Sequence, residues 1–182
     1  ELMDMMVTAG FNMVFLGIET PVKESLLETH KMQNIKSDLL ESIHAIQRKG
    51  MEVTGGFIIG FDNDPEDIFE RQIHFIQRSG IPSAMVGLLT ALPNTRLYKR
   101  LKTENRLVDV FTSGNNTHDL RLNFLPKMDV TKLIDGYKHV LSEIYKPGQY
   151  FNRCMALLRT LTSHHGAKRR IRMPELRALI LS

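Results

Sequence analysis

The sequence predicts an α/β fold in which parallel strands alternate with helices. Through the first two-thirds of the chain, short apolar runs alternate with amphipathic helical patterns, an order typical of right-handed βαβ units. The runs are apolar throughout, as expected of strands that are covered on both faces. The sheet therefore belongs either to part of an α/β barrel or to an open doubly wound sheet, and periodicity alone does not choose between them.

Three strands are predicted along this part of the chain. The first covers Asn12 to Ile18 and is entered through the turn at Ala9-Gly10. The second covers Met51 to Phe61, and the third covers Ser83 to Leu89. An amphipathic helical pattern precedes the first strand and begins at residue 1 without an initiating Met, from which we expect the chain to be a fragment of a longer protein.

Helices are predicted between the strands from their capping residues. Thr20-Pro21 resembles an N-cap with proline at the first helical position, so a short helix is expected over Val22 to His30. Ser37 to Lys49 places its apolar residues on one face and stops at Gly50.

The third predicted helix has the strongest start signal. Asp64 is a candidate cap, Pro65 follows it, and acids fill the first turn, where the helix dipole favours them. We expect this helix to end at Ser79-Gly80, and a further short helix over Asn94 to Lys102.

The character of the chain changes after about Asn105. A polar loop at Thr112 to His118 precedes a helix that Asp129 caps and that runs through Tyr145. Pro147-Gly148 breaks it, and a second helix follows to about residue 161. We therefore divide the chain into an α/β part (1–105), a separate α-helical appendage (106–163) and a basic tail (164–182).

The net charge of +4 comes from the tail. Residues 164–182 hold five basic residues and one acid, whereas the rest of the chain carries 19 of each sign. Aromatic residues that could stack on bases are absent from the basic run at 168–172, so no nucleic-acid partner is expected.

Composition excludes several other classes. The single cysteine, Cys154, rules out an internal disulfide framework, and no Cys/His group has zinc-finger spacing. No Walker A loop or Gly-x-Ser-x-Gly elbow occurs, and no apolar run is long enough for a transmembrane segment. A cytoplasmic location is the default expectation, and we nominate no catalytic or metal-binding residue.

Candidate ligand-binding residues follow each predicted strand, because parallel sheets bind ligands at the carboxyl ends of their strands. Glu19 follows a glycine at the end of the first strand. The second strand holds Gly55, Gly56 and Gly60, and glycines inside a strand indicate close approach of a ligand or tight helix packing. The third strand ends in a turn at residues 89–95.

At these strand ends the sequence resembles the second half of a radical S-adenosylmethionine (SAM) domain. Residues 15–20 (FLGIET) are similar to the fourth-strand signature of that superfamily, residues 56–61 (GFIIGF) to the fifth-strand motif, and residues 89–98 (LTALPNTRLY) to the end of the sixth strand. Residues 112–117 and 122–128 resemble the DUF4070 region that follows the radical domain in certain cobalamin-binding proteins, including hopanoid-biosynthesis relatives. The loop at residues 62–66 departs from the proline, glycine and glutamate that the family often has there.

The resemblance implies a SAM site. Glu19, after Gly17, would lie near the ribose or methionyl part of SAM. The adenine would be lined by residues of the second and third strands: Gly56, Ile58 and Gly60, with Leu89 and Thr90 beside them.

The family also requires a Cys-x-x-x-Cys-x-x-Cys loop for a 4Fe–4S cluster, which one cysteine cannot supply. The resemblance therefore implies the last strands of a radical SAM barrel, a partial (βα) barrel whose cluster ligands and cobalamin domain lie in a missing N-terminal half. Alone, such a chain should be inactive, marginally stable and aggregation-prone, because an unpaired strand edge and an apolar sheet face stay open.

Two alternatives stay open: a non-catalytic α/β binding or scaffold module, and an unrelated phosphate-binding barrel. The full-length protein is expected to act on a small-molecule substrate, by radical chemistry or by methyl transfer that uses SAM, the cluster and, where present, cobalamin. No polar constellation in the sequence identifies that substrate.

Overall fold

The computed structural model describes residues 1–28, 38–108 and 120–162. The predicted loop at residues 112–118 and the tail at 164–182 lie outside the described residues, and the helix predicted over 22–30 lies only partly within them. Within these ranges ten elements follow one another: α1 (Leu2–Thr8), β1 (Met13–Glu19), α2 (Lys23–Glu28), α4 (Leu39–Arg48), β2 (Glu52–Ile59), α5 (Ile68–Ser79), β3 (Ala84–Leu88), α6 (Arg96–Thr103), α7 (Val130–Ile144) and α8 (Pro147–Thr162).

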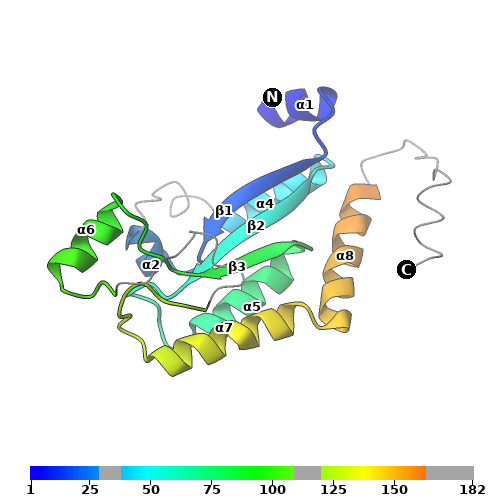
Figure 1. Cartoon of the computed structure of the whole chain (residues 1–182). Coiled ribbons are helices and arrows are strands. Elements are labelled where there is room, and N and C mark those ends of the chain that lie inside the picture. Colours follow the sequence, from blue (N-terminus) through cyan, green and yellow to red (C-terminus); the bar gives the residue numbers. More distant parts are fainter. Residues whose placement is uncertain (29–37, 109–119, 163–182) are drawn as a thin grey trace, which may run out of the picture.

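The predicted α/β architecture is confirmed as a small sheet of three parallel strands in the order β1-β2-β3. Gly17 pairs with Gly56 across β1 and β2, and Ile58 pairs with Gly87 across β2 and β3. All three strands end on the side where α2 and α6 lie (Figure 1). Closure of this sheet into a partial barrel stays a prediction.

Most predicted helix boundaries are confirmed by cap geometry. Asp38, Thr95 and Asp129 cap α4, α6 and α7, each accepting a hydrogen bond from the backbone amide three residues later. Gly80 ends α5 in the left-handed conformation that glycine adopts readily, with φ +66°.

The predicted start of the third helix is wrong by three residues. α5 begins at Ile68, and its N-cap is Asp67, whose side chain makes no capping hydrogen bond. Asp64 does not cap the helix because its carboxylate accepts hydrogen bonds from the amides of Gly60 and Phe61 instead. The aspartate therefore organises the turn that leaves β2 rather than the helix that follows.

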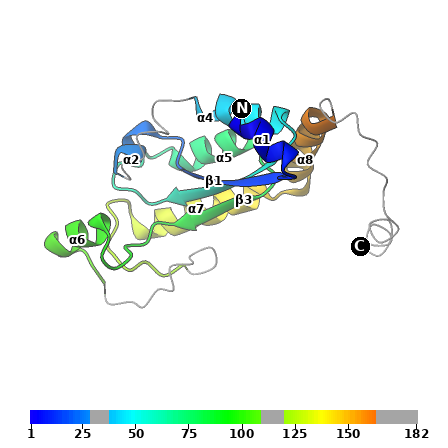
Figure 2. The same cartoon turned by 90° about the horizontal axis from the view of Figure 1, so that it is seen from above.

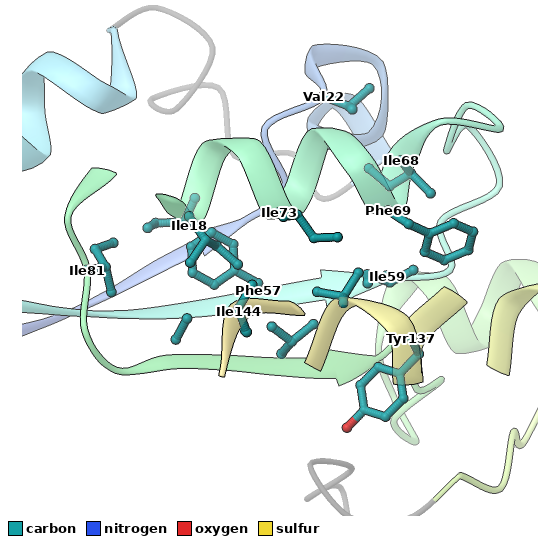
Figure 3. Packing of buried hydrophobic residues seen from close by; sticks show 14 of the residues in the cluster. Ile18, Val22, Phe57, Ile59, Ile68, Phe69, Ile73, Ile81, Tyr137 and Ile144 are labelled. Carbon is teal, nitrogen blue, oxygen red and sulfur yellow. The ribbon is translucent and has the colours of Figure 1, made fainter. Parts of the chain in front are cut away.

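Helices cover one face of the described sheet. From the sequence both faces are expected to be covered, because the predicted strands are apolar throughout. α4 and α5 lie on the same side of the strands, with α7 beside α5 and β3 (Figure 2). The main core lies between the sheet and these helices. It is formed by strand residues such as Phe57 and Ile59 with Ile68, Ile73 and Tyr137 from the helices (Figure 3). The opposite face of the described sheet is open.

That open face is apolar. Met13, Phe15 and Met85 project from it with relative exposures of 53%, 59% and 47%. Within the described residues the outer edges of β1 and β3 have no strand partner. Both features match the open edge and open apolar face expected from the sequence.

The helical region expected to be separate packs against the α/β body. Leu133, Tyr137, Val140 and Ile144 of α7 are buried in the same core as the strands. α8 is fixed by Arg153, which is 1% exposed and donates through Nε to the carbonyl of Ile81 at 2.9 Å. The domain boundaries at 105 and 163 stay predictions, but the two parts share one core.

Candidate functional site

A depression of about 340 Å³ lies on the open face at the carboxyl ends of the strands. Its volume falls within the range of about 300–1,000 Å³ that is usual for ligand pockets. The lining is mainly apolar and comes from all three strands and the residues after them: Phe15, Gly17, Glu19, Gly56, Phe57, Ile58, Met85, Gly87, Leu88, Leu89, Thr90 and Leu92.

Six of the seven residues predicted as a ligand site line this depression, namely Gly17, Glu19, Gly56, Ile58, Leu89 and Thr90. The seventh, Gly60, does not. It adopts φ +110°, and a Cβ at this position would lie 3.4 Å from a methyl group of Leu133 on α7. Gly60 therefore shapes the turn that follows β2, in a backbone conformation that residues with a side chain rarely adopt.

Three glycines from neighbouring strands line the middle of the depression. Gly17 and Gly56 are paired neighbours, and Gly87 pairs with Ile58 on the next strand. A Cβ on Gly87 would meet no atom within 4 Å, and one on Gly56 would lie 2.9 Å from the ring of Phe15. The backbone is therefore open to a ligand at Gly87, whereas the ring of Phe15 lies over Gly56. Sequence reasoning missed Gly87, although a glycine inside an apolar strand is the signal that identified Gly56.

Glu19 holds a strained backbone position at the edge of the depression. Its φ is +67°, and the pairing of β1 with β2 shifts register between Gly17 and Glu19. Bulges of this kind re-aim side chains near functional sites, and a left-handed conformation is uncommon for a residue other than glycine. The strain places a carboxylate, which accepts hydrogen bonds, in a mainly apolar lining.

The turn after β2 contains a partly buried carboxylate, that of Asp64, which sequence reasoning misassigned. Asp64 accepts hydrogen bonds through Oδ2 from the amides of Gly60 (2.8 Å) and Phe61 (3.0 Å), and through Oδ1 from the hydroxyl of Ser25 (2.6 Å). Burial raises the pKa of Asp64 above its ordinary value of 3.8, and these hydrogen bonds offset only part of that effect. Asp64 thus ties the end of β2 to α2.

Asp62, two residues earlier, is held by arginine side chains from α6 and from the segment after it. Its side chain is 2% exposed and forms ion pairs with Arg106 at 2.6 Å and Arg100 at 2.8 Å. Burial acts to raise the pKa of Asp62, but the hydrogen bonds and charges of Arg106 and Arg100 outweigh it, so the pKa is lowered. No local sequence signal identifies these partners, which lie 44 and 38 residues away.

The described part of the chain contains no group of three His, Cys, Asp or Glu residues that could hold a metal ion. Cys154 lies on α8, next to Arg153, which donates to the carbonyl of Ile81 before β3, and it does not line the depression. α8 lies at the opposite end of the sheet from α2 and α6 (Figure 1). No helix among residues 1–28, 38–108 and 120–162 has the length and apolar character needed to cross a membrane.

Residues 95–182 match a known family, the domain of unknown function DUF4070. The DUF4070 region predicted from the sequence is therefore confirmed, and the match begins at the N-cap of α6.

The chain is also similar to several methyltransferases. It is 41% identical over 153 residues to an uncharacterized methyltransferase of Synechocystis sp. and 33% identical over 153 residues to a hopanoid C-2 methylase of Rhodopseudomonas palustris. Each alignment covers 84% of this chain but 28% of the relative. A bacteriochlorophyllide d C-12(1)-methyltransferase of Chlorobaculum tepidum is 24% identical over 84% of this chain and 33% of its own length. The chain thus spans about a third or less of these relatives.

Proposed function

We propose that this chain is the C-terminal part of a radical SAM methyltransferase. Its residues 95–182 carry a DUF4070 region, and it is related to methyltransferases over most of its length. The depression on the open sheet face is its part of the SAM site. The observation that carries the proposal is that six residues nominated from three separate sequence motifs line this one depression.

The lining fits the chemistry of SAM. The open space over Gly87 leaves room for a planar adenine, and Ile58 and Leu89 supply apolar contacts beside it. The ring of Phe15, which lies over Gly56, is a further apolar surface. The carboxylate of Glu19 can accept hydrogen bonds from the ribose hydroxyls or the methionyl ammonium group. When bound, SAM supplies the methyl group, or the radical that its reductive cleavage yields.

The residues of this chain have a positioning role in that chemistry. The apolar lining excludes water from the ligand, and Gly87 lets the backbone of β3 approach it closely. Glu19 orients the polar part of the ligand from its fixed left-handed position. We nominate no residue of this chain as a proton donor or acceptor for the reaction.

A 4Fe–4S cluster does not fit the residues of this chain. Three clustered thiolates are needed, and the 182 residues contain one cysteine, on α8 at the other end of the sheet. We propose that the cluster ligands lie elsewhere in the full-length protein and that strands from that part complete a barrel over the open face. Cobalamin, which the resemblance also implies, stays a prediction.

SAM titration calorimetry on the full-length protein tests the proposal, with Gly87→Val as the blocking variant. Because a Cβ at Gly87 meets no neighbour within 4 Å, the valine should enter the depression without disturbing the fold. Gly148→Val on α8 is the matched control, since its Cβ is equally free. We expect Gly87→Val to weaken SAM binding at least about tenfold and Gly148→Val to leave it unchanged.

The outcomes separate the alternatives. Loss of SAM affinity in Gly87→Val but not in Gly148→Val, together with methyl transfer by the wild type, supports the proposal. SAM binding without methyl transfer to any acceptor would favour a non-catalytic binding module. Equal SAM affinity in both variants would place the ligand elsewhere, and binding of inorganic phosphate instead of SAM would favour a phosphate-binding barrel.

A further inference from the structure

Two side chains from the C-terminal region hold the loops that follow β2 and β3. Arg106 contacts the loop after β2, and Asn123 contacts the loop after β3. Both residues fall within the DUF4070 match. The DUF4070 region therefore contacts both loops.

Asn123 satisfies both backbone polar groups of Ala91. Its Oδ1 accepts from the Ala91 amide at 3.0 Å, and its Nδ2 donates to the Ala91 carbonyl at 2.8 Å. Ala91 is fully buried and has left the ladder of β3, so without the side chain both groups would be unpaired away from water. Thr90, the residue before it, lines the depression. The amide of Asn123 therefore sets the path of that wall.

Arg106 performs the equivalent role at the loop after β2. Its Nη2 and Nη1 donate to the two carboxylate oxygens of Asp62 at 2.6 and 2.7 Å. Such bidentate pairs fix the orientation as well as the distance of a carboxylate. Asp62 is two residues after Gly60 and two before Asp64, whose carboxylate holds the same turn.

Arg106 and Asn123 are held together by one short β-bridge. Leu107 and Phe124 form an antiparallel bridge, with hydrogen bonds from the Val108 amide to the Asn123 carbonyl and from the Leu125 amide to the Arg106 carbonyl. Phe124 packs in a second core with Phe61, Leu89 and Ala91, and Ile58 of the depression packs against it. We call Arg106, Asn123 and the Leu107–Phe124 bridge the clamp.

We propose that the clamp is a positioning device for the depression: through it the DUF4070 region fixes the loops after β2 and β3 in the shape that binds the ligand. The role in ligand binding rests on the proposed function, whereas the role in ordering the loops does not. Arg106 and Asn123 are positioning residues, because neither lines the depression itself.

The test uses the full-length protein with Asn123→Ala, Asn123→Asp and Arg106→Gln. Asn123→Asp keeps the acceptor for the Ala91 amide but sets a carboxylate oxygen against the Ala91 carbonyl, and Arg106→Gln supplies the second arm if the Asn123 variants do not fold. Asn152→Ala on α8 and Arg71→Gln on α5, whose ion pair is exposed, are the matched controls. Hydrogen–deuterium exchange without ligand reports on the loops, and calorimetry reports the SAM affinity.

We expect faster hydrogen–deuterium exchange in peptides covering residues 60–64 of Arg106→Gln and in peptides covering residues 89–92 of the Asn123 variants. These variants should also bind SAM about tenfold more weakly, and neither quantity should change in the controls. Unchanged exchange in the variants would overturn the clamp. Faster exchange with unchanged SAM affinity would overturn its role in shaping the site. Wild-type protein that fails to bind SAM would instead contradict the proposed function, and the exchange result would still decide whether the clamp orders the loops.

Discussion

The amide of Gly60 donates a 2.8 Å hydrogen bond to Oδ2 of Asp64, and this contact closes the turn at the end of β2. Phe61 donates to the same oxygen, so one partly buried carboxylate satisfies two successive amides. Ser25 donates to the other oxygen and joins the turn to α2. The turn that leaves β2 thus depends on an acid that does not line the depression.

Asp64→Asn should change how stability depends on pH. The pKa of Asp64 is raised in the folded protein, so its contribution to stability is complete below about pH 3.8 and is lost as the pH rises through the folded pKa. Asparagine can accept from the same amides without ionising. We expect urea unfolding to show that the variant gains stability relative to the wild type as the pH rises towards neutral.

Asp67→Asn is the control for that measurement, since Asp67 is an exposed acid nearby. Its ion pair with Arg71 is exposed, so the substitution should change the stability by less than about 1 kcal/mol. A difference between Asp64→Asn and the wild type that grows towards acid pH would contradict the assignment. Asp64→Ala, which leaves the two amides without their acceptor, should lose about 2 kcal/mol.

Asp62→Asn should have the opposite pH dependence. The pKa of Asp62 is lowered, so the stability it contributes is present above about pH 3.8 and is lost as the pH falls through the folded pKa. At neutral pH we expect the variant to lose about 2 kcal/mol in urea unfolding, because Arg106 loses a charged partner. The loss should shrink on acidification.

Glu104→Gln removes the other acidic partner of Arg106, one that is 38% exposed. Exposed ion pairs contribute little, so this control should cost less than about 1 kcal/mol. Equal losses in Asp62→Asn and Glu104→Gln would show that burial of Asp62 does not strengthen its ion pair.

Much of the fold was predictable because its signals are local. The cap at Asp129 and the helix end at Gly80 are read from a few adjacent residues, and the apolar runs marked the three described strands. Asp64 was misassigned for the same reason. A proline and acids after it favour a helix cap, whereas its hydroxyl partner, Ser25, lies 39 residues earlier in the chain.

The candidate site was predictable where a motif marks a strand end and not where the contact is long-range. Gly56 and Glu19 stand in recognisable positions, and both line the depression. Asn123 pairs with Ala91 across 32 residues, and nothing near either residue indicates it. The open face was also invisible to periodicity, because a strand that forms a ligand floor is as apolar as a buried one.

Glu19→Gly should separate stability from ligand binding. Glycine adopts φ +67° without strain, which offsets its larger loss of entropy on folding, so the variant should be as stable as the wild type or more stable by up to about 1 kcal/mol. SAM affinity should fall because the carboxylate is gone. Asn105→Gly, at φ +53°, is the control and should change neither quantity much. Thermal melts and calorimetry measure the two effects, and unchanged SAM affinity would remove Glu19 from the site.

Gly136→Ala tests whether α7 belongs to the core of the α/β body. A Cβ at Gly136 would overlap the ring of Phe69 on α5, so the two helices could no longer pack as they do. Overpacking of this kind costs about 1–3 kcal/mol, more than the roughly 1 kcal/mol that alanine gains over glycine in a helix. We expect a net loss of stability in urea unfolding and a lower Tm.

Gly148→Ala on α8 is the matched control, because its Cβ meets no atom within 4 Å and the substitution should leave the Tm unchanged or raise it. Phe69→Leu supplies the second arm. A smaller ring removes the overlap, so Gly136→Ala should cost less in the Phe69→Leu background than in the wild type, a coupling expected only of residues in contact. If Gly136→Ala instead raises the Tm as an exposed helical glycine would, α7 does not pack on α5, and the helical region is then the separate appendage that the sequence alone predicts.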